Sequence, residues 1–496
     1  MSSLLARQVR CTLAIAVAGW IAAVSSFARA ADPPTAAPAS PPSSEPAGAP
    51  AGEPASVPRG GGDEGLGPES APSVTLLSGE AGWKLAFFGW AEADAMYDTT
   101  QSFTDSVTNS TVSRPNTIAG DNPRFQGSVR DSRIGLKAAA PTFEGMKASA
   151  LMEADFFGLP STAATQDQYY DASIIRLRQF YMKLQTPIVD VLVGQTNDLF
   201  GWGGQGFFPS TPAFLGVMGE VFHRNPQLRL SKTFGGSSAQ LELAVAGVRP
   251  ADRDSALPDL QAGIRLSLPG WQGASAQGPR RASAAPMAIG ISAVGRRLAV
   301  GDFSTVPGDL HVVYAGGAAA DVFIPIIPAH GTDLSNALSL VGEFSWGTGI
   351  ADLYLNLTGG VLFPSLPNPH NTLPAPTYTP NIDNGIATYD ANGALHTIDW
   401  QAFMVGANYH LPFRHGTMFW ISGTYSQNYS DNAVAVTPSL GQTYVWNKGR
   451  YWDATVWWDI TPAFQMALSC QTMTQTFGDG VNATNRRGEA SWWMFF

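Results

Sequence analysis

The protein has 496 residues, a net charge of -10 and only 14% charged residues. No basic stripe suited to nucleic acid runs along the chain, so nucleic-acid binding is excluded. Beyond the first thirty residues there is no run of about 18 apolar residues, which excludes helical membrane spans. The 52 glycines and the 11% aromatic content instead suit one large β-barrel.

Residues 1–30 have the three parts of a secretory signal peptide. Two arginines form a basic start, an apolar run follows from Cys11 to Phe27, and Ala28-Arg29-Ala30 offers small residues at a cleavage site. A retained membrane anchor is the alternative, but the apolar run is short and serines interrupt it. Without this segment only Cys470 remains, so no intramolecular disulfide is expected.

Residues 31–72 are rich in Pro, Ala, Ser, Gly and Glu and hold almost no large apolar side chain. Such a segment cannot bury enough surface to offset the entropy cost of ordering it. We therefore expect a disordered periplasmic tether, followed by a barrel domain over residues 73–496.

The first predicted strand, Trp83 to Asp98, alternates at period two. Leu85, Phe87, Ala91 and Ala93 are among the residues on one side, while the other side carries the charges. A soluble sandwich strand would show the same pattern, so one strand decides little. The pattern then repeats along the chain, and about 16 strands can be counted.

Connection lengths give a check on this strand count. Long polar segments follow the odd strands and short turns follow the even ones, as expected for a barrel in which both chain termini face the periplasm. The segment from Pro269 to Pro286 is an exception, because it is long for a periplasmic turn. The class predicted is an all-β transmembrane antiparallel barrel.

The last ten residues, Arg487 to Phe496, form an apolar alternating strand that an exposed soluble terminus rarely carries. Its natural partner is the first strand, because a barrel must close on itself. Trp493 and Phe495 lie on the inward parity, and we expect them near the periplasmic rim. Four tryptophans at strand ends are interpreted as an interfacial girdle, with a sugar-binding platform as the alternative: Trp457, Trp458, Trp492 and Trp493.

The segment from Asn197 to Phe222 is the candidate constriction loop, folded into the barrel. Its glycines allow sharp bends and its aromatic side chains can wedge it against the wall. The alternative is a loop that packs outward at a subunit contact or covers the barrel mouth. The residues predicted to shape it are Gly201, Trp202, Gly204, Phe207 and Phe208.

Charged residues on the inward parity are the candidates for selecting solutes. Arginine keeps its charge and offers a planar fork to carboxylates, so a ladder of arginines would attract anions. Alternatively each is paired with a carboxylate and only holds the wall. The basic candidates are Arg133, Lys137, Arg176, Arg178, Arg229, Arg265 and Arg296, and the acidic ones are Glu92, Asp94, Glu153 and Asp155.

Catalytic and metal-binding patterns are not found. The seven histidines are scattered, and no serine stands in a nucleophile-elbow context. We therefore expect no enzyme activity, no metal and no cofactor.

Several stretches together resemble the DcaP-like family of outer-membrane porins. This resemblance implies a 16-stranded homotrimeric barrel in the bacterial outer membrane that passes small, often anionic, organic solutes. Neutral solutes are also expected, and a secreted or surface carbohydrate-binding all-β protein is the competing interpretation. The chain departs from some relatives in having the Pro/Ala tether in place of a helical segment. The resemblance is carried by Phe88 to Asp98, Asp131 to Lys137, Glu153 to Gly158, Arg176 to Arg178, Val193 to Thr196 and Asn225 to Arg229.

Overall fold

The structure is a computed structural model of the chain. The predicted signal peptide (1–30) and tether (31–72) lie outside the residues that it describes. Those residues are 73–78, 82–105, 111–158, 173–203, 206–212, 217–252, 254–276, 282–302, 308–355, 382, 385–390, 392–412, 418–437 and 443–496.

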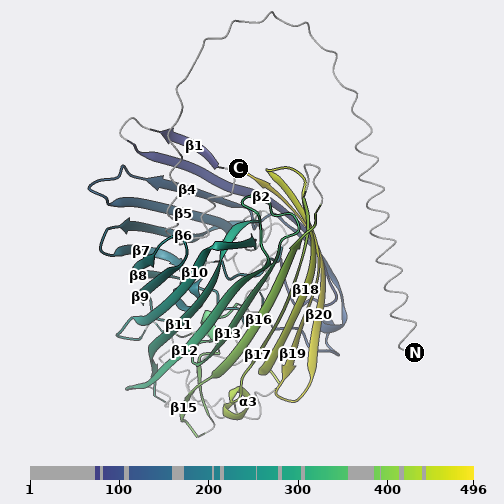
Figure 1. The fold of residues 1–496 in the computed structure, drawn as a ribbon. Helices are drawn as coiled ribbons and strands as arrows, with labels where there is room; N and C mark the ends of the chain where they lie inside the picture. The colour runs from purple at the N-terminus through teal and green to yellow at the C-terminus, as the bar shows by residue number, and fades with distance from the viewer. Residues whose placement is uncertain are drawn as a thin grey trace, which may run out of the picture. The chain divides into compact units, whose positions relative to one another are not determined.

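The described residues form a closed antiparallel barrel of 16 strands, which confirms the predicted fold class (Figure 1). β3 and β4 both pair with β2, so together they make one interrupted barrel strand. The strands are β2 (Lys84–Asp98), β3 (Arg124–Ser128), β4 (Arg133–Ala139), β5 (Lys147–Gly158), β6 (Ile174–Gln185), β7 (Asp190–Asn197), β8 (Arg224–Gly235), β9 (Gln240–Val248), β10 (Asp259–Ser275), β11 (Ser283–Gly301), β12 (Leu310–Ile327), β13 (Leu338–Thr348), β16 (Asp399–His410), β17 (Met418–Tyr429), β18 (Trp446–Asp459), β19 (Phe464–Phe477) and β20 (Asn482–Phe495).

The seam of the barrel is the pairing of β2 with β20, as the sequence predicts. Trp90 pairs with Phe495 and Asp98 with Arg487. Gly89 N donates to Phe496 O at 2.8 Å, and Phe496 N donates back to Gly89 O at 3.0 Å. The chain therefore pairs its backbone up to its last residue, and the closed barrel has no free edge along this seam.

Strand β1 (Ser73–Ser78) was not foreseen from the sequence. It pairs with the first residues of β2, from Ser73 opposite Phe88 to Ser78 opposite Lys84. It thus occupies the same edge of β2 as β20, directly beyond Phe496. All six residues are exposed, so β1 extends the sheet past the barrel without adding to its interior.

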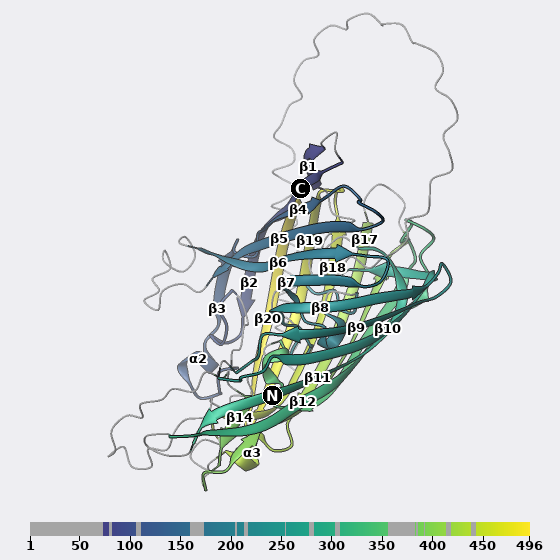
Figure 2. The ribbon, with the colours of Figure 1, turned by 90° about the vertical axis from the view of Figure 1, so that its left-hand side faces the viewer.

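The two ends of the barrel differ. The end that holds the C-terminus, termed the turn end, also holds most of the short connections (Figure 1). The opposite end, termed the loop end, holds the long connections and several small elements (Figure 2). The small elements of the chain are β14 (Ala387–Tyr389), β15 (Leu395–Thr397), α2 (Ile118–Asp121), α3 (Ala433–Val436), and the 3-10 turns η2 (Phe200–Trp202) and η3 (Ala351–Leu353).

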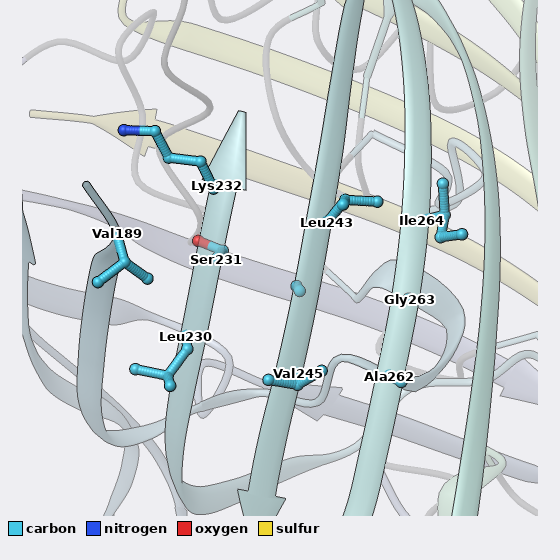
Figure 3. Close-up of a pocket in the computed structure, with 10 residues that line it drawn as sticks. Val189, Leu230, Ser231, Lys232, Leu243, Val245, Ala262, Gly263 and Ile264 are labelled. Carbon is cyan, nitrogen blue, oxygen red and sulfur yellow. The ribbon is translucent and has the colours of Figure 1, made fainter. Parts of the chain in front are cut away.

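Side chains alternate between an apolar outside and a polar or packed inside. On β8 the exposed Leu228 and Leu230 flank the buried Arg229. A shallow hollow of about 400 Å³ lies on the outer wall and is lined by Leu230, Leu243 and Ile264 among others. Figure 3 shows these side chains on neighbouring strands. An apolar outer wall of this kind suits contact with lipid, because aliphatic side chains are more stable in hydrocarbon than in water.

No helix among the described residues is long and apolar enough to cross a membrane.

One orientation predicted from alternation is wrong. Period-two alternation places Tyr181 on the same face as Ile175 and Leu177, which are exposed. A bulge in β6 places Leu177 opposite Ala154 and Gln179 opposite Glu153, which leaves Arg178 as an extra residue. The inserted residue reverses the parity, so Tyr181 points inward and packs with Phe88, Leu151 and Leu192.

The seam holds a buried ion pair that gives a stability prediction. Arg487 Nη2 lies 2.8 Å from Asp98 Oδ2, and Asn485 also donates to Asp98 at 2.7 Å. Asp98→Ala would leave the Arg487 guanidinium buried without its carboxylate, so we expect a loss of about 3 kcal/mol of unfolding free energy. Urea unfolding followed by heat-modifiable gel migration measures this.

The matched control is Asp479→Ala. Asp479 pairs with Arg114 at the surface, where solvent screens the charges, so stability should hardly change. Equal effects of the two substitutions would contradict a special role for the seam pair.

Candidate functional site

The inner loop is defined as residues 198–223, and its described residues, 198–203, 206–212 and 217–223, lie inside the barrel. Its neck is closed by Asp198 N, which donates to His223 O at 2.9 Å. Beyond the neck, Phe200 N donates to Gln261 Oε1 on β10 and Gly201 N donates to Ser292 Oγ on β11. Both acceptors are inward-facing side chains, so the loop leaves β7, passes inside β8 and β9 and reaches the wall formed by β10 and β11.

Trp202 fixes the inner loop against that wall. Its Nε1 donates to Ile291 O at 3.1 Å, and its ring covers Gly263 and Gly290. A methyl group added at Gly290 would lie 2.5 Å from Trp202 Cδ1, so only glycine admits the ring there. Gly201 has φ +72°, which supplies the sharp bend expected of it.

The far part of the inner loop is held by the strands beyond. Ser422 Oγ donates to Ser210 O at 2.7 Å, and Ser426 Oγ donates to Met218 O at 2.8 Å. Phe207 is buried, while the half-buried Phe208 packs edge-on against Phe222 at a centroid distance of 4.9 Å. Gly204 lies outside the described residues, so its predicted role stays a prediction.

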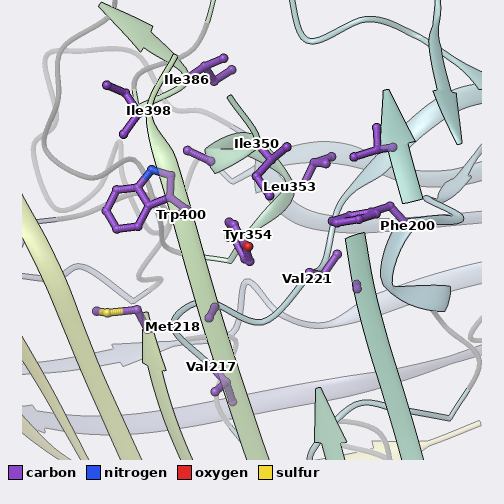
Figure 4. Close-up of a cluster of buried hydrophobic side chains, with 14 of the residues drawn as sticks. Phe200, Val217, Met218, Val221, Ile350, Leu353, Tyr354, Ile386, Ile398 and Trp400 are labelled. Carbon is purple, nitrogen blue, oxygen red and sulfur yellow. The ribbon is translucent and has the colours of Figure 1, made fainter. Parts of the chain in front are cut away.

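A second loop segment, residues 349–355, enters the barrel and pairs with the inner loop. Leu355 N donates to Glu220 O at 2.8 Å and Phe222 N donates to Leu353 O at 2.9 Å. Figure 4 shows the resulting buried cluster, in which side chains of both segments meet Trp400 of β16. The sequence did not predict this second insertion, because nothing local distinguishes residues 349–355 from an external loop.

Three predicted arginines meet two predicted carboxylates on the wall formed by β4, β5 and β6. Arg178 lies 2.8 Å from both Glu153 Oε1 and Asp155 Oδ2. Arg176 lies 2.7 Å from Asp155, and Arg133 lies 3.5 Å from Glu153. The strand register places these residues side by side, since Arg133 and Arg176 both pair with Asp155.

The remaining predicted residues spread more widely. Arg265 pairs with Glu242 at 2.6 Å and lies 5.6 Å above the ring of Trp202. Arg229 donates to Gln227 and to Asn197 O, at the neck of the inner loop. Glu92 accepts from Trp90 Nε1 at 2.8 Å, while Asp94 and Lys137 are half-buried on the inward parity. Arg296 is held by Asp259 and Asp352.

Arg224 was missed by sequence reasoning. It stands at the start of β8 and interacts electrostatically with Arg133, Arg176, Arg178 and Asp155. Its Nη1 atom is buried and has no hydrogen-bond partner. Strand alternation would place Arg224 outward, because its neighbour Asn225 points inward.

Three acidic side chains were also missed. Asp321 and Glu343 face each other on β12 and β13, and Glu343 accepts from Val221 N of the inner loop at 2.7 Å. Glu220 lies beside Glu343. Burial is the larger cause and the negative charge of Glu343 the smaller one, and together they raise the pKa of Glu220 well above its ordinary range. This acidic cluster holds the inner loop on the part of the wall away from Arg133, Arg176 and Arg178.

The tryptophan girdle predicted from the sequence is partly wrong. Trp457 and Trp493 point into the barrel near the turn end, where Trp420 stacks on Trp457 at 4.4 Å. Both rings are fully buried in one cluster with Trp90 and Phe495. They offer no open ring face for a sugar, and the inward position of Trp493 and Phe495 near this rim agrees with their parity.

Among the described residues, no group of three or more His, Cys, Asp or Glu side chains is placed to hold a metal ion.

The closed barrel, its apolar outer wall and its inward-folded loop define the fold of a porin-type outer-membrane channel. The outer membrane channel DcaP of Acinetobacter baumannii shares this fold, with a TM-score of 0.58 and 15% identity over 85% of this chain and 100% of that chain. Also similar are Salmonella typhi OmpF in complex with daunomycin (TM-score 0.47, 10% identity, 85% and 100% covered) and Pseudomonas putida OprB (0.44, 11%, 83% and 94%). The sequence matches no protein-family model and none of the curated proteins.

The neck of the inner loop gives a pH prediction. Burial alone would lower the pKa of His223, but the hydrogen bond and charge of Asp198 raise it on balance, against a smaller opposing effect of Arg224. Conversely His223 lowers the pKa of Asp198 below its ordinary range despite burial. The His223 contribution is complete below an unfolded pKa of about 6.5 and is lost as pH rises through the higher folded value. The Asp198 contribution is complete above about pH 4 and is lost as pH falls through the lower folded value.

We therefore expect wild type to be more stable than His223→Gln at pH 5 to 6, and the difference to shrink at pH 9. Thermal midpoints of the heat-modifiable transition at both pH values measure this. A difference that grows toward pH 9 would contradict the assigned ion pair.

Proposed function

We propose that this protein is an outer-membrane porin that passes small hydrophilic solutes by diffusion, as a homotrimer, and does no bond chemistry. The observation that carries the proposal is the combination of an apolar outer wall with an interior of charged side chains and an inserted loop. A lipid-facing barrel needs the first, and a selective aqueous path needs the second.

A preference for anionic organic solutes rests on how the inward ion pairs are oriented. The side chain of Arg176 is 31% exposed, whereas its partner Asp155 is 0% exposed. In the pair of Arg265 and Glu242 the arginine is again the more exposed side chain, at 13% against 7%. In both pairs the arginine side chain is the more exposed partner, so a solute that reaches either pair meets the arginine before the carboxylate.

Arg224 strengthens this preference. It places a further guanidinium beside Arg176 and Arg178. Its Nη1 atom is buried, so Arg224 adds to the local field and not to the contacts that a solute makes. Neutral solutes would pass without using this field.

Planar-bilayer reconstitution under a salt gradient tests the proposal. Discrete conductance steps with a reversal potential of anion-selective sign are expected. The absence of any conductance from heat-modifiable protein would overturn the channel function, and a cation-selective sign would overturn only the anion preference. Chemical crosslinking in detergent should give a trimer, and a monomer would remove that part of the proposal.

Arg176→Gln should reduce the ratio of anion to cation permeability by about twofold or more, because it removes the most exposed inward cation of these pairs. The matched control is Arg450→Gln, which removes the same charge from the outer face of β18. The reversal potential measures both. Equal shifts in the two variants would mean that net charge alone, and not the position of Arg176, sets the selectivity.

A further inference from the structure

The end of β10, before the β10–β11 turn, departs from the alternation expected of a strand in the barrel wall. Up to Ser267, β10 alternates between exposed and buried residues, but Gly273, Ala274, Ser275 and Ala276 are all buried in succession. A strand in the barrel wall always has one face outside, so continuous burial means that these residues have left the wall. This hairpin is the segment whose length was exceptional in the sequence.

A register shift marks the place where the hairpin bends. Leu268 pairs with Met287, but the next pair joins Gln272 to Pro286. Three residues of β10, Pro269 to Trp271, therefore have no partner on β11, where Pro286 and Met287 are consecutive. Such an insertion bends a ladder sharply, and here two prolines flank the bend.

Past the bend, the hairpin lies against inward-facing residues of other strands. Trp271 Nε1 donates to Pro325 O on β12 at 2.9 Å, and Ala329 N donates to Gln272 O at 2.9 Å. A methyl group added at Gly273 would lie 2.5 Å from Ser339 Oγ of β13, so the backbone reaches the third strand from β10. The described residues of the hairpin beyond the bend, 272–276 and 282–285, thus run along the inside of the turn end.

The hairpin end also meets the inner loop and the aromatic floor. Ser210 Oγ of the inner loop donates to Ala276 O at 2.7 Å. Ala276 belongs to the buried cluster that contains Trp420 and Trp457, and Ala282 packs against the same cluster. An element from the turn end and a loop from the loop end therefore touch inside the barrel.

We propose that the inward-folded arms Gln272–Ala276 and Ala282–Ala285 form a second restriction of the path, at its turn end. This inference rests on the proposed channel function and adds the element that sets the largest solute able to leave the barrel. Small side chains suit this role, because alanine, glycine and serine let the hairpin lie close to the wall, as Gly273 does against Ser339.

Replacing residues 269–286 by Asn-Gly tests the restriction. Leu268 and Met287 already pair, and a two-residue turn joins such a pair without changing the register. Single-channel conductance should rise by about twofold or more, and larger neutral sugars should enter liposomes in a swelling assay. The matched control applies the same replacement to residues 140–148, in a turn whose Phe143 is 65% exposed, and conductance should stay unchanged.

A charge placed on the hairpin provides a second test, which does not depend on the truncated barrel folding. Ser283 is half-buried and pairs with Ser275. Ser283→Lys should shift the reversal potential toward anion selectivity and Ser283→Glu toward cation selectivity. The same substitutions at the exposed Ser237, in the β8–β9 turn, should shift it much less.

The outcomes separate this inference from the proposed function. If wild type conducts and the folded truncated variant has the same conductance and solute limit, the restriction is overturned while the channel stands. If wild type is silent and the truncated variant conducts, the restriction is supported and free diffusion through wild type is overturned. If neither wild type nor the truncated variant conducts, both proposals are overturned. If Ser283→Lys and Ser283→Glu shift the reversal potential in the same direction, the restriction is overturned.

Discussion

The structure depends on the closure of the sheet between β2 and β20. A barrel wall in lipid can leave no backbone donor or acceptor unpaired, because no water is present to satisfy it. The chain meets this requirement up to its last residue, where Phe496 exchanges two hydrogen bonds with Gly89. The buried pair of Arg487 and Asp98 fixes the register of the same seam from inside. Once the seam is closed, the direction of every inward side chain follows from strand parity and the bulges that interrupt it.

Closure creates an interior that the chain then fills from both ends. The inner loop enters from the loop end and is held by side chains of β10, β11 and β17. The β10–β11 hairpin enters from the turn end and meets the loop at Ser210 and Ala276. Because each element lies on wall residues and on the other element, their positions are coupled. A change in the loop near Ser210 should therefore affect the hairpin, although the two segments enter from opposite ends of the barrel.

The number of inward arginines does not by itself determine the ion selectivity. Arg133 and Arg178 point inward as their parity requires, yet both are buried and paired with Glu153. These two hold the wall. Arg176 and Arg265 are paired as well, but their side chains stay partly exposed. Burial, which depends on what covers a residue, separates the two groups where sequence parity cannot.

The sequence alone determined the number of strands, their order and the face of most side chains, because period-two alternation is a local property. Leu228, Arg229 and Leu230 could be assigned inward or outward without any knowledge of their neighbours. The bulge that turned Tyr181 inward was not visible, since an inserted residue is defined by the partner strand. Arg224 and the second inserted segment were missed for a related reason, since their neighbours come from distant parts of the chain. The inward fold of the hairpin, although its length was noticeable, depends on contacts with Pro325 and Ser339 on strands later in the chain. Tertiary structure decided these features because they arise from packing between segments that only barrel closure brings together.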